Sequence, residues 1–117
     1  MYLENGQVQL HNGDMLEVLD AIPENVVDSC ITDPPYDLTD GKSKKGFMGK
    51  AWDGTGIAFR VETWQKVLRA MKPGAMLCAF GSPRTFHRMM VAIEDAGFEL
   101  RDTISWNHSE GFPHGLD

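Results

Sequence analysis

The stretch that decides the fold is Val26-Val27-Asp28-Ser29-Cys30-Ile31-Thr32-Asp33-Pro34-Pro35-Tyr36. Its first seven residues are rich in β-branched side chains and end abruptly at a proline pair, which is typical of a buried parallel strand. Each proline fixes its own φ angle and pushes the preceding residue toward extended geometry. We therefore expect Asp33 to be held stiffly at the end of this strand, with its carboxylate projecting outward.

The segments on either side alternate between strand and helix patterns. Turn and cap residues such as Asp14, Lys72-Pro73-Gly74 and Ser82-Pro83 separate them. These signals predict strands over 7–11, 26–32, 75–80 and 98–106, and helices over 15–22, 64–71 and 83–97. This order predicts an α/β fold, a mostly parallel sheet with helices on both faces. Ligands of such sheets bind beyond the carboxyl ends of the strands.

Length and composition restrict the class of protein. The chain has 117 residues, 42% of them hydrophobic and 24% charged, which is about one globular domain. No apolar stretch approaches the roughly 18 residues of a membrane span, so a cytoplasmic location is expected by default. The net charge of −6 argues against a non-specific nucleic-acid binder, and any DNA contact must be local. Cys30 and Cys78 lie in apolar runs and are expected to be reduced and buried, and no metal site is predicted.

The Asp33-Pro34-Pro35-Tyr36 turn carries groups that suit the activation of an exocyclic amine. A carboxylate oxygen beside a backbone carbonyl can accept both hydrogens of an NH2 group, which draws the nitrogen toward tetrahedral geometry and frees its lone pair. A carboxylate is too weak a base to deprotonate such an amine outright, so Asp33 is assigned positioning and charge stabilisation. The ring of Tyr36 can stack on a base rotated out of a duplex. The alternative is a rigid strand end with a packed tyrosine.

Residues 37–58 are predicted to form a long mobile loop, because they show no sustained periodicity. The loop is locally positive within an acidic chain and also has aromatic surface, which suits contact with nucleic-acid phosphates. The alternative is a set of solvated lysines. The residues concerned are Lys42, Lys44, Lys45, Lys50, Phe47 and Trp52.

Several motifs together resemble the amino-methyltransferases of the permuted beta type, in particular phage and prophage DNA adenine methylases. The resemblance covers nearly the whole chain. Its motifs are Gly13-Asp14-Met15-Leu16, Asp33-Pro34-Pro35-Tyr36, Gly46-Phe47-Met48-Gly49-Lys50-Ala51-Trp52-Asp53, Met71-Lys72-Pro73-Gly74, Phe80-Gly81-Ser82-Pro83-Arg84-Thr85 with His87-Arg88, and Gly97-Phe98-Glu99-Leu100-Arg101-Asp102 leading to Trp106.

The resemblance implies a partial Rossmann-like methyltransferase fold, S-adenosylmethionine as cofactor and double-stranded DNA as partner. It implies that Asp33, Pro34, Pro35 and Tyr36 are catalytic and that Asp14 and Asp33 lie on the cofactor side; for Asp14, a plain helix cap is a compatible alternative. The residues expected at the DNA or the flipped base are Lys44, Lys45, Phe47, Lys50, Trp52 and Trp106. For Trp106, a core position is the alternative.

Two features of the family are not found in this sequence. Enzymes of this type carry a Phe-x-Gly-x-Gly cofactor loop, which in the permuted order follows the target-recognition region. Gly54-Thr55-Gly56 lies within the long loop and is rejected as a match. Residues 1–117 are therefore expected to be the N-terminal part of a methyltransferase catalytic domain. A missing C-terminal half, a second subunit or a homodimer is the expected complement.

The predicted function is transfer of a methyl group from S-adenosylmethionine to the N6 amine of adenine in DNA. Methylation of cytosine N4 is the nearest alternative, for which serine at position 33 would be typical. Protein-glutamine methylation is disfavoured because that family has asparagine there. A remnant that binds DNA or a partner without catalysis also stays open. Arg84, His87 and Arg88, at the start of the last predicted helix, either favour an anionic group or are merely solvated.

Overall fold

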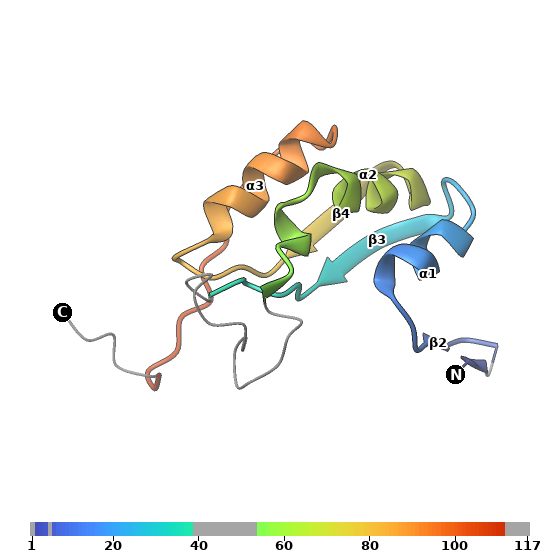
Figure 1. Ribbon diagram of the computed structural model, residues 1–117, viewed down its shortest axis with the longest axis horizontal. Helices are drawn as coiled ribbons and strands as arrows, with labels where there is room; N and C mark the ends of the chain where they lie inside the picture. The colour runs from blue at the N-terminus through green and yellow to red at the C-terminus, as the bar shows by residue number, and fades with distance from the viewer. Residues whose placement is uncertain (1, 5, 39–53, 112–117) are drawn as a thin grey trace.

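The computed structural model describes residues 2–4, 6–38 and 54–111. They form two small sheets, three α-helices and a 3-10 turn (Figure 1). The elements in chain order are β1 (Tyr2–Glu4), β2 (Gln9–His11), α1 (Met15–Ala21), β3 (Val27–Thr32), the 3-10 turn η3 (Ile57–Phe59), α2 (Val61–Ala70), β4 (Met71–Ala79) and α3 (Phe86–Asp95).

The central sheet consists of β3 and β4, which run parallel as predicted for residues 26–32. Ser29 pairs with Met76 and Ile31 with Cys78, but near the start of the sheet the register shifts between Val27 and Ser29. Residues 72–75 of β4 lie opposite the single residue Asp28 of β3, and Gly74 among them has a φ of 82°, a backbone conformation that favours glycine. The strand therefore begins directly after α2, earlier than the predicted residue 75.

The first predicted strand belongs to a separate hairpin. Only Gln9–His11 are β-structure, and they pair antiparallel with Tyr2–Glu4. A short turn through Gly6, with a φ of 84°, is enough to join two such short segments. Part of the predicted strand at 7–11 is thus confirmed, but it lies in an antiparallel hairpin and not in the parallel sheet. Figure 1 shows β1 and β2 apart from the β3–β4 sheet.

The helices lie close to their predicted positions. Asp14 caps α1, because its Oδ1 accepts the amides of Leu16 at 2.9 Å and Glu17 at 3.4 Å. The last helix, α3, begins at Phe86, three residues later than predicted. Residues 83–85 form a turn in which the Phe86 amide donates to the Ser82 carbonyl at 2.8 Å.

A helical layer over one face of the sheet forms the core. Trp64 and Val67 of α2 and Met89 and Ile93 of α3 are buried, and half-buried residues of the sheet, among them Cys30 and Leu77, pack against them. The Trp64 Nε1 donates to the Ala58 carbonyl at 2.8 Å, which ties η3 to α2. Leu19 of α1 packs against the same cluster. The apolar residues of the helices predicted over 64–71 and 83–97 are thus the source of the core.

The other face of the sheet is exposed, and we call it the bare face. Its residues are Ser29, Ile31, Met76 and Cys78. Ile31 is 77% exposed and Met76 is 62% exposed. The prediction of helices on both faces was therefore wrong for the part of the chain that the structure describes. Both cysteines are free thiols, as predicted, but Cys30 is only half-buried and Cys78 is exposed.

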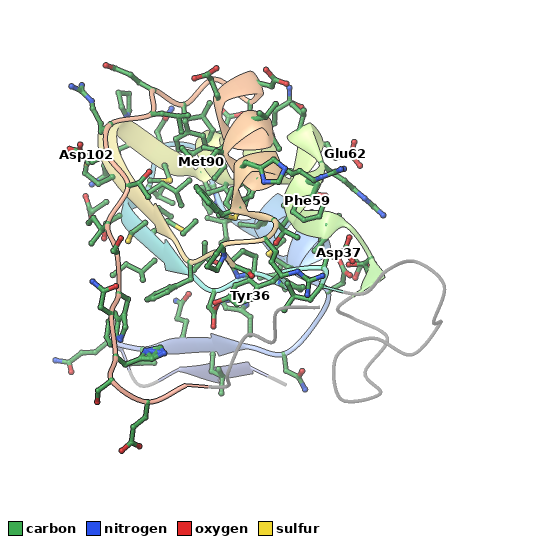
Figure 2. All side chains as sticks on the ribbon, turned by 90° about the vertical axis from the view of Figure 1, so that its left-hand side faces the viewer. Tyr36, Asp37, Phe59, Glu62, Met90 and Asp102 are labelled. Atoms are coloured by element: carbon green, nitrogen blue, oxygen red, sulfur yellow. The ribbon has the colours of Figure 1, made fainter. Side chains whose placement is uncertain are left out.

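Residues 98–106 do not form the predicted strand. Ile104 is 84% exposed and Trp106 is 76% exposed, and the segment has no ladder to β3 or β4. A strand requires a neighbour that accepts and donates its backbone hydrogen bonds, and an alternating pattern alone cannot supply one. Figure 2 shows Asp102 on this extended segment, away from the helical layer.

The predicted loop of residues 37–58 is described only at its ends. Residues 39–53 lie outside the described part of the chain, and Ile57–Phe59 form η3. Within the described ranges, none of the helices is long and apolar enough to cross a membrane.

Candidate active site

The Asp33-Pro34-Pro35-Tyr36 turn lies at the carboxyl end of β3. The ladder to β4 continues as far as a bond from the Phe80 amide to the Thr32 carbonyl at 2.9 Å, directly before the turn. The Tyr36 hydroxyl then donates to Oδ1 of Asp33 at 2.7 Å. Asp33 is exposed, whereas both prolines and Tyr36 are half-buried. The turn thus offers an exposed carboxylate at the sheet edge where ligands of parallel sheets bind.

Tyr36 is held in its neutral form by its surroundings. Burial, the hydrogen bond to Asp33 and the negative charge of that carboxylate together raise the pKa of Tyr36 to about 12. A phenol that stays protonated keeps donating to the carboxylate. The bond therefore orients the side chains of Asp33 and Tyr36 relative to each other.

A second hydrogen bond holds the turn from the segment that connects β4 to α3. Thr85, which precedes α3, donates its hydroxyl to the Tyr36 carbonyl at 2.7 Å. The connection from β4 to α3 is tight here: a Cβ on Gly81 would lie 2.8 Å from Cβ of Phe86 and 3.1 Å from Cε of Met89. Only glycine fits that position without displacing α3. A shift of α3 would therefore also displace Thr85 and its hydrogen bond to the turn.

Phe80 and Trp106 bring an aromatic pair to the same end of the sheet. Their ring centroids are 6.1 Å apart with the planes tilted by 55°. Phe80 directly follows β4, whose last residue, Ala79, pairs with Thr32 beside the turn. Trp106 is thus an exposed aromatic residue and not a core residue, which corrects the core alternative.

Of the remaining predicted site residues, Asp14 lies at the start of a helix and the others lie outside the described residues. Asp14 lies before α1, where its carboxylate acts as the helix cap. The predicted DNA contacts in the long loop lie outside the described residues: Lys44, Lys45, Phe47, Lys50 and Trp52, together with Lys42.

A pocket of about 360 Å³ opens directly beside the turn. Its lining includes Asp37 and Phe59, together with Arg84 and Thr85 from the segment before α3 and His87 and Arg88 from the first turn of α3. Figure 2 shows Asp37 next to Tyr36 where the chain leaves the sheet, with Phe59 of η3 close to Asp37. The Thr85 hydroxyl bond to Tyr36 joins this pocket to the turn.

Three of these residues were not found as site residues by sequence reasoning. Thr85 was read only as part of a family motif, Asp37 was assigned to the long loop, and Phe59, directly after that loop, was given no role. Asp37 has a φ of 54°, a left-handed conformation that aspartate adopts more readily than most residues. The proline pair before it gives a weak signal for such a turn. Within the described ranges, no group of three or more His, Cys, Asp or Glu side chains could hold a metal ion.

Comparison with known proteins gives partial matches. The type II methyltransferase M.ScaI of Streptomyces caespitosus is 38% identical over 47 residues, which are 40% of this chain. M.HindIII of Haemophilus influenzae is 34% identical over 55 residues, or 46% of this chain, and M.BamHI of Bacillus amyloliquefaciens is 29% identical over 76 residues, or 65%. The matches span 15%, 18% and 18% of those relatives, respectively. No solved structure matches the chain.

The family is shown by a match over most of the sequence. The N6/N4 methyltransferase family model, described as DNA methylase, matches residues 27–116. That range begins with β3 and includes the turn at Asp33, the pocket residues and Trp106. The chain therefore belongs to the DNA methylase family.

Proposed function

We propose that this chain takes part in transferring a methyl group from S-adenosylmethionine to the N6 amine of adenine in double-stranded DNA. The observation that carries the proposal is the hydrogen-bonded turn at Asp33, in a chain of the DNA methylase family. The turn presents an exposed carboxylate at the carboxyl end of a parallel strand and is held from two sides, by Tyr36 and by Thr85.

Asp33 and the Pro34 carbonyl act on the amine. Oδ1 of Asp33 accepts the Tyr36 hydroxyl, and Oδ2 is the oxygen offered to one N–H of the base. The Pro34 carbonyl accepts the other N–H, because proline leaves the carbonyl as its backbone hydrogen-bonding group. Both bonds favour a tetrahedral nitrogen with its lone pair free for the new N–C bond. The amine becomes acidic only as that bond forms. Asp33 stabilises the developing positive charge, and the released proton passes to solvent.

Tyr36 and Trp106 supply aromatic surface for the extruded base. The Tyr36 ring is tied at its hydroxyl by Asp33, and the backbone carbonyl of the same residue is tied by Thr85. A ring fixed in this way can stack on a base without losing much further conformational freedom. Trp106, exposed beside Phe80, is a second stacking surface at the same end of the sheet.

The described residues fit part of a cofactor site. S-adenosylmethionine, when bound, supplies the methyl group as an electrophile. Asp33 is exposed where ligands of parallel sheets bind, so its carboxylate suits a positively charged cofactor. Asp14 is a weaker candidate, because its Oδ1 already accepts two backbone amides of α1. We assign Asp33 and Asp14 to the cofactor side on these grounds and on the family resemblance.

DNA and a complementing protein surface are the proposed partners. We assign Lys44, Lys45, Phe47, Lys50 and Trp52 to DNA contact on the basis of their charge and aromatic character. The bare face exposes Ile31 and Met76, and burying such apolar surface against a second subunit or a further protein segment would stabilise the fold.

The test is methyl transfer from labelled S-adenosylmethionine to a duplex that contains both adenine and cytosine, with the methylated base identified by mass spectrometry. Asp33→Ala is expected to lower transfer at least 100-fold and cofactor binding by no more than about tenfold, because the carboxylate is only one of the groups assigned to the cofactor side. Asp28→Ala is the matched control: this exposed aspartate lies on the same strand and pairs with Lys72 at 2.6 Å, away from the turn.

Three outcomes would change the proposal. Equal loss of transfer and cofactor binding in Asp33→Ala would make Asp33 a structural residue. Recovery of N4-methylcytosine in place of N6-methyladenine would change the substrate. No cofactor binding by the wild-type protein, even with a complementing C-terminal half that carries a Phe-x-Gly-x-Gly loop, would favour a non-catalytic DNA-binding or partner-binding role.

A further inference from the structure

The pocket beside the turn has an unusual charge for this chain. The protein carries 17 acidic and 11 basic side chains, yet the described pocket wall brings together Arg84, His87 and Arg88 with one carboxylate, Asp37. Among the described residues, the ion pairs occupy Lys66, Lys72 and Arg101 instead. Both pocket guanidinium groups are therefore available to a ligand.

These cations lie where a helix tolerates them least. The N-terminal end of a helix carries a partial positive charge, which favours acidic side chains and disfavours basic ones. The first turn of α3 contains no acidic residue, and Thr85 at its N-cap makes no side-chain cap bond. Arg84 precedes this turn and His87 and Arg88 lie within it. An anion bound in the pocket would offset both the helix charge and the repulsion between the two arginines.

The position and volume of the pocket restrict the kind of anion that can bind there. The pocket shares Thr85 with the turn and continues from Tyr36 into Asp37, so its ligand must lie next to whatever occupies the turn. Its volume of about 360 Å³ holds more than a single small ion. An arginine fork matches two phosphate oxygens, and two arginines that line the same pocket can clamp one phosphodiester.

We propose that Arg84, His87 and Arg88 bind a backbone phosphate of the DNA strand that carries the target base, next to the extruded nucleotide. This inference rests on the proposed function. The phosphate contact fixes the register of the strand over the turn, while Asp33 and Tyr36 act on the base itself.

The test compares Arg84→Gln and Arg88→Gln with Arg101→Gln, using fluorescence anisotropy of a labelled duplex over a series of salt concentrations. Arg101 is the matched control because it is an exposed arginine outside the pocket, paired with Glu99 at 3.2 Å. Each pocket variant is expected to bind the duplex about tenfold more weakly and to lower the magnitude of the salt slope by about 1. The weakening should be the same for duplexes of different sequence. Arg101→Gln should match the wild type.

Separate outcomes distinguish this inference from the proposed function. If the wild type binds and methylates DNA but both pocket variants keep its affinity and salt slope, the phosphate site is wrong and the function stands. If the wild type binds no duplex, both fail. A loss of S-adenosylmethionine binding in the variants would assign the pocket to the carboxylate of the cofactor. A shift of the His87 ring resonances by inorganic phosphate that duplex DNA does not compete away would assign it to free phosphate. Either result overturns the proposal.

Discussion

The two faces of the β3–β4 sheet differ sharply, although they are built from the same residues in alternation. Cys30, Leu77 and Ala79 point to the helical layer and pack against the core. Their neighbours Ile31 and Met76 are 77% and 62% exposed. Apolar side chains therefore contribute to stability here only on the face that α2 and α3 cover, because the hydrophobic effect depends on area removed from water.

The largest test of this comparison is a pair of substitutions on the two sides. Trp64→Ala removes a side chain that is 2% exposed and a hydrogen bond to Ala58, and it should lower the free energy of unfolding by about 3–5 kcal/mol. Ile31→Thr keeps a β-branched residue on the bare face and should change it by less than about 0.5 kcal/mol. Urea denaturation followed by circular dichroism measures both.

The comparison would break if Ile31→Thr cost as much as Trp64→Ala. Such a result would mean that the bare face is covered in solution, for example by a second copy of the chain. Sedimentation at several protein concentrations then separates a dimer from a monomer.

The next largest effect concerns the glycine that lets α3 approach β4. Gly81→Ala would place a Cβ 2.8 Å from Cβ of Phe86, which the helix can relieve only by moving, and should cost about 1–3 kcal/mol. Gly111→Ala is the control, since the nearest atom there is Nε2 of His108 at 3.9 Å. Thermal unfolding measures both, and similar melting temperatures would show that α3 has room to shift.

The smallest expected effect is a loss of stability at high pH, and it comes from Tyr36 in the turn at the end of β3. Its pKa is raised to about 12, above the ordinary value of about 10. The folded state thus holds this proton more tightly than the unfolded state, and the resulting stability is present below pH 10 and is lost as the pH rises toward 12. Ultraviolet titration of tyrosinate should show a late step that Tyr36→Phe removes and Asp33→Ala moves to lower pH.

Tyr2, the other tyrosine, provides the control for that titration. Tyr2→Phe should leave the late step in place. A wild-type protein in which both tyrosines ionise near pH 10 would show that the Asp33–Tyr36 hydrogen bond does not persist in solution.

Sequence patterns predicted the elements whose partners are close or whose pattern is strong. The cap at Asp14 needs only two neighbouring amides, and the stripe of Trp64 and Val67 needs only an apolar layer. The strand predicted over 98–106 has an equally clear alternation of side chains, but it would need a neighbouring strand that is distant in sequence. Its apolar side chains at Ile104 and Trp106 consequently stay exposed. Local pattern predicts the conformation that a segment prefers and not the presence of its partner.

The candidate site divides in the same way. Asp33 and Tyr36 were predicted because two prolines constrain the backbone locally. Thr85 was missed as a contact of Tyr36, since 49 residues separate them and no periodicity links their positions. The pocket at Arg84 and Arg88 likewise arises from three segments that meet only in the folded chain.

The two cysteines lie on opposite faces of the sheet, so the reactivity of each thiol reports the solvent exposure of its face. Cys78 projects from the bare face, whereas Cys30 lies on the covered face, where burial raises the pKa of its thiol. A thiol reagent should therefore modify Cys78 well before Cys30. Protection of Cys78 would report the arrival of any molecule on that face without a label having to be introduced.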